Sequence, residues 1–119
     1  MKLAVTSTGQ DLDSPVDPRF GRAAYVLIVD ADTMAFEVVD NAENINAFKG
    51  AGIQAATMIS DKQADVLLTG FCGPNAFKTL EAAGIQVAGD VSGTVREAVA
   101  KFVDGNIKLT SAPNTQGHW

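Results

Sequence analysis

Residues 66–105 read VLLTGFCGPNAFKTLEAAGIQVAGDVSGTVREAVAKFVDG. Two short apolar runs in this segment, 66–68 and 85–87, predict strands that are buried on both faces of a sheet. Each run is followed by a predicted helix, over 74–83 and 95–104, because apolar residues recur there at helical spacing. Strands that alternate with helices in this way predict parallel pairing and right-handed crossovers.

Local signals mark the limits of these two helices. Pro74 suits a first helical position, where a missing N–H costs nothing. Thr94 and Glu97 form a capping box, in which each residue satisfies a backbone donor of the other. Gly84 and Gly105 suit the positions that follow helix ends.

The first half of the chain has a different pattern. Residues 1–6, 24–30 and 35–39 are apolar and favour strands, and the last two are close enough to form a hairpin. Residues 40–49 are polar and predict a loop. Helical spacing then begins near residue 50 and ends near residue 62.

These elements predict the order β-β-β-α-β-α-β-α and an α/β fold class. The simplest single sheet is five-stranded and mixed, with strand order 3-2-1-4-5 and an antiparallel second strand. It forms one domain over residues 1–109, followed by a polar tail over 110–119 that we expect to be mobile. Ligands in open α/β sheets bind beyond the carboxyl ends of the strands, where the chain changes direction. The loops 7–22 and 70–74 are expected to meet there.

Composition narrows the classes of function. The chain has 119 residues, 46% of them hydrophobic, and carries a net charge of −5. This charge argues against nucleic acid and against anionic membranes as partners. No charged leader and no apolar run of about 18 residues is present, so we expect no membrane span. A single cysteine, Cys72, cannot form an internal disulfide, which favours a reducing, cytoplasmic location.

The segment 11–22, here called the arginine loop, reads DLDSPVDPRFGR. Its two prolines keep it out of a helix interior or a central strand, and a connection this long usually has a function. Arg19 and Arg22 carry permanently charged, planar forks of donors that suit an anionic ligand. The alternative is that both arginines pair with the aspartates of the same loop and only fix its shape.

Glycines precede or open the predicted helices at Gly50-Ala51-Gly52 and at Gly73-Pro74. Helix N-termini attract anions, and glycine lets a bulky ligand approach the backbone. The alternative is that these glycines only make tight turns. Neither segment matches a nucleotide-binding phosphate loop.

Cys72 lies between a predicted strand and a helix N-terminus. This position predicts a lowered thiol pKa and a possible ligand for a soft metal. The alternative is a small buried hydrophobic residue, which is the usual role of an unpaired cysteine.

Catalytic constellations are weak. His118, the only histidine, lies one residue from the end of the sequence and is a poor candidate for a fixed base. The aspartates of the arginine loop could cluster only through loop placement, so a two-metal hydrolase is the least favoured class. We therefore expect no enzyme activity. Phe20 and Phe71, judged as residue types alone, are expected in the core.

Three motifs occur in order: residues 16–23, VDPRFGRA; residues 50–55, GAGIQA; and residues 68–70, LTG, with 73–77, GPNAF. Together they resemble the dinitrogenase iron–molybdenum cofactor biosynthesis family, which includes NifX, NafY and the C-terminal part of NifB. Within that family the chain is most similar to the orange-protein members of sulfate-reducing bacteria, notably over residues 3–7 and 13–22. The resemblance implies a ribonuclease-H-like domain that carries a preformed metal–sulfur cluster.

For the orange-protein members the implied cargo is a molybdenum–copper–sulfide cluster held without covalent bonds. The residues that match the needs of such a polyanion by type are Arg19, Phe20, Gly21, Arg22, Gly50, Gly52, Cys72 and Gly73, with Cys72 as a possible metal ligand. Two alternatives stay open: an iron–molybdenum cluster precursor as cargo, or a protein-interaction or regulatory module with no fixed metal. Protein partners for cluster delivery or regulation are compatible with either cargo.

Overall fold

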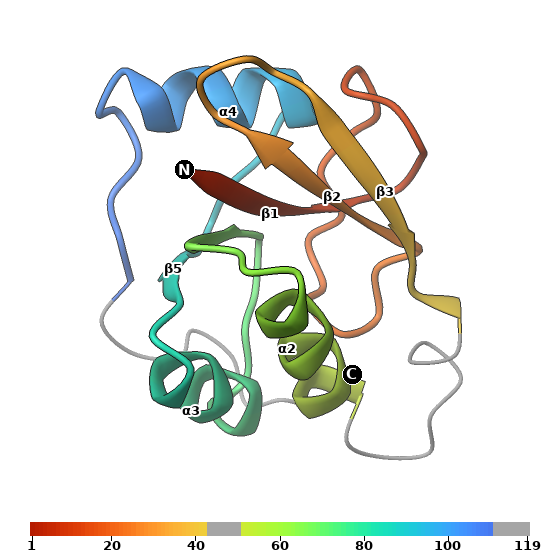
Figure 1. Cartoon of the computed structure of the whole chain (residues 1–119), viewed down its shortest axis with the longest axis vertical. Coiled ribbons are helices and arrows are strands. Elements are labelled where there is room, and N and C mark those ends of the chain that lie inside the picture. Colours follow the sequence, from red (N-terminus) through yellow and green to blue (C-terminus); the bar gives the residue numbers. More distant parts are fainter. Residues whose placement is uncertain (43–50, 111–119) are drawn as a thin grey trace.

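The computed structural model describes residues 1–42 and 51–110. Five strands form one mixed sheet in the order β3-β2-β1-β4-β5 (Figure 1). Their bounds are β1 Lys2–Ser7, β2 Tyr25–Asp30, β3 Phe36–Asp40, β4 Val66–Leu68 and β5 Gln86–Ala88. β2 is antiparallel to both β1 and β3, whereas β4 is parallel to both β1 and β5. The predicted strand order and orientations are confirmed.

Three helices flank the sheet within the described residues: α2 Ala51–Asp61, α3 Pro74–Ala82 and α4 Val95–Val103. α2 and α3 lie on one face, and α4 lies on the other (Figure 1). Pro74 occupies the first turn of α3, and the predicted capping box of α4 is present. No described helix is both long and apolar enough to cross a bilayer.

The sheet separates two apolar clusters because side chains alternate between faces along each strand. Ala4 and Leu67 point to the side of α2 and α3, where Ile59 and Leu80 cover them. The neighbouring residues of the same strands point to α4. These central strand positions are 0% exposed, which explains the continuous apolar runs in the sequence.

The last described residue, Thr110, lies against the edge of the sheet. Its N–H donates to the Val87 carbonyl at 2.6 Å, and its hydroxyl accepts from the Gly89 N–H at 2.8 Å. Thr110 is thus fixed to β5. The rest of the predicted tail, with His118, lies outside the described residues.

Candidate functional site

The connections that follow β1, β4 and β5 meet at one edge of the sheet. The arginine loop, which belongs to the connection after β1, forms bridges to three segments. Val16 bridges Ser7 at the end of β1, Arg19 bridges Phe71 after β4, and Pro15 bridges Thr94 after β5. Backbone hydrogen bonds between these segments hold the contacts; for example, the Val16 N–H donates to the Gly93 carbonyl at 2.8 Å. The structure therefore brings the arginine loop to the predicted switch point of the sheet.

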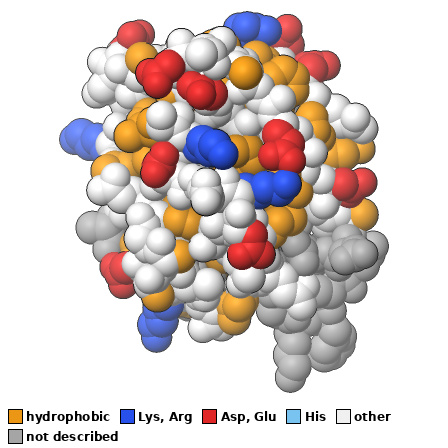
Figure 2. Space-filling model, in the orientation of Figure 1, with side chains coloured by type: hydrophobic (Ala, Val, Ile, Leu, Met, Phe, Trp, Pro, Cys, Tyr) orange, Lys and Arg blue, Asp and Glu red, His pale blue; other side chains and the backbone are white. Residues whose placement is uncertain are grey.

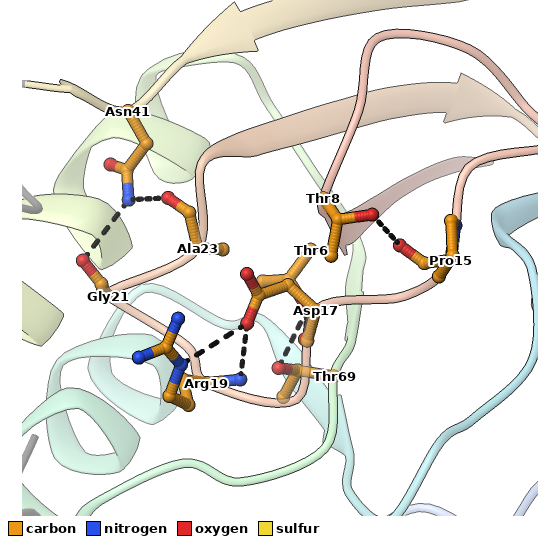
Figure 3. A network of polar contacts seen from close by, with 9 residues as sticks. All are labelled: Thr6, Thr8, Pro15, Asp17, Arg19, Gly21, Ala23, Asn41 and Thr69. Carbon is orange, nitrogen blue, oxygen red and sulfur yellow. Dashed lines mark hydrogen bonds and ion pairs between the residues drawn. The ribbon is translucent and has the colours of Figure 1, made fainter.

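A buried polar network fixes the turn that carries Arg19 (Figure 3). The Thr6 hydroxyl donates to the Asp17 carbonyl at 2.6 Å, and the Thr6 and Thr69 hydroxyls share a hydrogen bond of 2.9 Å. The Asp17 carboxylate accepts from the Arg19 N–H at 3.0 Å. Thr6 and Thr69 are 0% exposed and Asp17 is 5% exposed. β1 and β4 thereby position the start of the Arg19 turn directly.

The Arg19 guanidinium makes one ion pair, in which Nε lies 3.6 Å from Asp17 Oδ1. Half of the Arg19 side chain is exposed. Within the described residues its terminal nitrogens make no other ion pair. An aspartate of the same loop thus pairs with Arg19, as the alternative expects for this arginine, while half of the side chain stays accessible to solvent. Asp13 pairs instead with Arg96 of α4 at 2.9 Å.

The second half of the arginine loop is held by Asn41, which directly follows β3. The buried Asn41 amide donates to the carbonyls of Gly21 and Ala23 at 3.1 and 2.8 Å (Figure 3). Its backbone N–H donates to the Ala24 carbonyl at 3.1 Å. Arg22 lies in this braced segment and is partly buried. The sequence analysis did not identify Asn41, although an asparagine directly after a strand was a visible signal.

The glycines of the site have a packing role. Gly21 has a φ of +94°, and a Cβ placed there would lie 2.9 Å from both Cα and N of Gly52. A Cβ on Gly52 would lie 2.9 Å from the Ala76 Cβ. The arginine loop therefore lies backbone to backbone against α2, and α2 in turn packs closely on the Ala76 side chain of α3. Gly50 lies outside the described residues.

The N-terminus of α3 also belongs to this edge. Gly73 is its N-cap residue, and among the described residues no side chain caps it. The first turn of a helix leaves N–H groups without intrahelical partners. Pro74 has no N–H, so Asn75 and Ala76 supply the donors of this turn. These N–H groups and the positive end of the helix dipole suit an anion.

Cys72 is 1% exposed and belongs to the apolar cluster under α2 and α3. Burial raises the pKa of its thiol to about 12. The predicted lowering of this pKa is therefore wrong: the desolvation cost of a thiolate outweighs the nearby helix N-terminus. Among the described residues, no group of three or more His, Cys, Asp or Glu side chains could hold a metal ion.

The two phenylalanines differ in environment. Phe20 is 3% exposed and faces the core, so the apolar surface expected of it does not lie on the outside of the site. Phe71 is 36% exposed, contrary to the core position expected for it. Phe71 thus supplies accessible aromatic surface beside Arg19. Sequence reasoning missed this, because the residue type alone does not show which side of a loop faces the core.

On the face drawn in Figure 2, basic side chains are few and stand among acidic ones, in keeping with the net charge of −5. The accessible features of the edge are a half-exposed guanidinium, an aromatic side chain and the first turn of α3. Together they can bind an anion that also has apolar or polarizable surface.

This arrangement defines a class of protein: a small α/β domain in which the arginine loop meets the connections after β4 and β5 at the switch point of the sheet. More particularly, the chain belongs to the family described as dinitrogenase iron-molybdenum cofactor, whose family model matches residues 1–105. The family resemblance carried by the sequence motifs is thus confirmed.

Solved structures agree with this assignment. The chain is 50% identical to the apo form of the orange protein from Desulfovibrio gigas, with 96% of each chain covered and a TM-score of 0.94. It is 35% identical to a Thermotoga protein described as a candidate NifB, with 98% of each chain covered and a TM-score of 0.83. A candidate dinitrogenase from Methanocaldococcus jannaschii, at 17% identity, 95% and 97% coverage and a TM-score of 0.69, shares the fold. No curated protein matches the chain significantly.

Proposed function

We propose that this protein is a non-catalytic carrier of a preformed molybdenum–copper–sulfide cluster. The cluster would be held without covalent bonds at the edge where the arginine loop meets β4 and α3. One observation carries the proposal most: a braced, half-exposed Arg19 stands at the switch point of a chain that is 50% identical to an orange protein. The choice of a molybdenum–copper–sulfide cluster as cargo is based on the resemblance of residues 3–7 and 13–22 to the orange-protein members of the family.

The chemistry of the cargo matches the accessible groups. A metal–sulfide cluster is a bulky polyanion with polarizable sulfur on its surface. Arg19 offers positive charge, and the first turn of α3 after Gly73 offers N–H donors. Arg22 adds a second charge in the same braced loop. Non-covalent binding is also consistent with Cys72, because its raised pKa keeps the thiol protonated at neutral pH.

The family description favours one alternative cargo, an iron–molybdenum cluster precursor, since the family is described by the iron–molybdenum cofactor. The same charged edge would accept either polyanion. Elemental analysis separates the two, because a precursor of this type contains iron and the preferred cluster contains copper.

The test of the site is cluster uptake by the double variant Arg19→Ala, Arg22→Ala. The Arg19 N–H still bonds Asp17 when the side chain is removed, so we expect the variant to fold. Two lost charges at one polyanion predict a loss of affinity of at least about 100-fold, taking about 1.5–3 kcal/mol for each hydrogen bond to a charged group. Arg96→Ala is the matched control, because Arg96 is the third arginine and pairs with Asp13. Unchanged uptake in the folded double variant would contradict the proposed site.

A further inference from the structure

Arg19 and Phe71 emerge together from the site edge. They are paired as partners of a parallel bridge, with the Phe71 N–H donating to the Pro18 carbonyl at 2.6 Å and the Phe20 N–H donating to the Phe71 carbonyl at 3.1 Å. Successive side chains of extended backbone point to opposite sides, and bridge partners share a side. Burial follows this rule: Phe20 and Cys72 face the core at 3% and 1% exposure.

The outward pair is therefore a guanidinium beside an aromatic side chain. Half of the Arg19 side chain and 36% of Phe71 are accessible. The bridge holds their backbones in register, so a ligand that contacts the Arg19 fork also lies against Phe71. The second phenylalanine of the site, Phe20, is too deeply buried to contribute such surface.

A guanidinium alone does not distinguish one kind of anion from another. Molybdate and phosphate present hard, strongly hydrated oxygen atoms, and placing them against an aromatic side chain removes water without a replacing hydrogen bond. A thiometallate presents large, polarizable sulfur atoms, which gain dispersion and sulfur–aromatic contacts with the same side chain. The aromatic surface therefore favours sulfur-coated anions over oxygen-coated ones of the same charge.

We infer that Phe71 is a specificity-determining residue that makes this edge prefer thiometallates to oxometallates. The inference rests on the proposed function, since it concerns the same site and the same class of cargo. Specificity is a difference between two affinities, so Phe71 is expected to change the ratio of the affinities rather than both equally.

The experiment compares tetrathiomolybdate with molybdate, two dianions that differ in the atoms around molybdenum. Dissociation constants for both are measured by equilibrium dialysis with the full-length protein and with Phe71→Ala. We expect Phe71→Ala to weaken tetrathiomolybdate binding by about three- to tenfold, which is the upper part of the range of sulfur–aromatic contacts. The molybdate constant should change less than about twofold. Phe71→Leu retains apolar area without the ring, so its affinity for tetrathiomolybdate should lie between those of the unaltered protein and Phe71→Ala.

Phe36→Ala is the matched control. Phe36 is a phenylalanine of similar exposure, 41%. It lies at the start of β3, at the end of the sheet where β1 begins, and therefore away from the carboxyl end of β1. It should leave both constants unchanged. Circular dichroism of each variant confirms the fold.

The possible results separate the two hypotheses. Equal changes for both anions in Phe71→Ala, or no change for either, would overturn the role of Phe71, while the double arginine variant still tests the carrier. If the unaltered protein binds no tetrathiomolybdate, either alone or with copper, the proposed function fails, and the inference falls with it.

Discussion

Replacing Gly21 by alanine tests how tightly the arginine loop is packed on the helices. Two costs add at this position. A φ of +94° places a side chain in a region that costs about 1–2 kcal/mol for a residue other than glycine. The new Cβ would also lie 2.9 Å from backbone atoms of Gly52, and overpacking of this kind costs about 1–3 kcal/mol. We therefore expect a loss of about 2–5 kcal/mol in the free energy of unfolding.

Gly84→Ala separates these two costs. Gly84 has a φ of +78°, and no atom lies within 4 Å of a Cβ placed there, so only the backbone cost applies. For a domain of this size, 1 kcal/mol corresponds to about 4 °C in the melting temperature. Thermal and urea unfolding should thus show a loss of about 8–20 °C for Gly21→Ala and about 4–8 °C for Gly84→Ala. Equal losses in the two variants would refute the close contact between the arginine loop and α2.

Two further predictions concern buried groups. Because burial raises the pKa of the Cys72 thiol to about 12, a thiol reagent at pH 8 should label the folded protein more slowly than the protein in urea, by on the order of 1,000-fold. The unfolded thiol ionises at a lower pH than the buried thiol. The free energy of unfolding should therefore fall as pH rises above about 9, by up to about 1.4 kcal/mol per pH unit. Rapid labelling of the folded protein would contradict the raised pKa. Asn41→Ala should cost about 2–4 kcal/mol in urea unfolding, because the carbonyls of Gly21 and Ala23 lose their buried donor, and a neutral effect would show that solvent replaces that donor.

The fold followed from the sequence because its signals were local and mutually consistent. The runs 66–68 and 85–87 needed burial on both faces, which α2 and α3 supply on one face and α4 on the other. The capping box at Thr94 fixed the start of α4 by chemistry between residues three apart. The meeting of the arginine loop with the connection after β4 then followed from topology alone.

The details of the site depended on contacts between distant residues, which spacing cannot show. Cys72 follows a strand and precedes a helix, but the packing of two helices over it decides its burial and its pKa. Phe20 lies in the core as its residue type predicts, but Phe71 is exposed, because a single bridge determines which side of each segment faces outward. Gly21 and Gly52 meet across thirty-one positions of sequence, so their glycine requirement is steric and could not be read from either segment.

The cargo itself is tested most directly by isolating the protein from its source without oxygen and recording a visible spectrum and an elemental analysis on the same fraction. We expect molybdenum and copper in a fixed ratio to protein, with strong charge-transfer absorption. Iron with molybdenum would assign the precursor cluster instead. Purification of a colourless protein free of all three metals, which also takes up no tetrathiomolybdate with copper, would contradict the proposal that it is a cluster carrier.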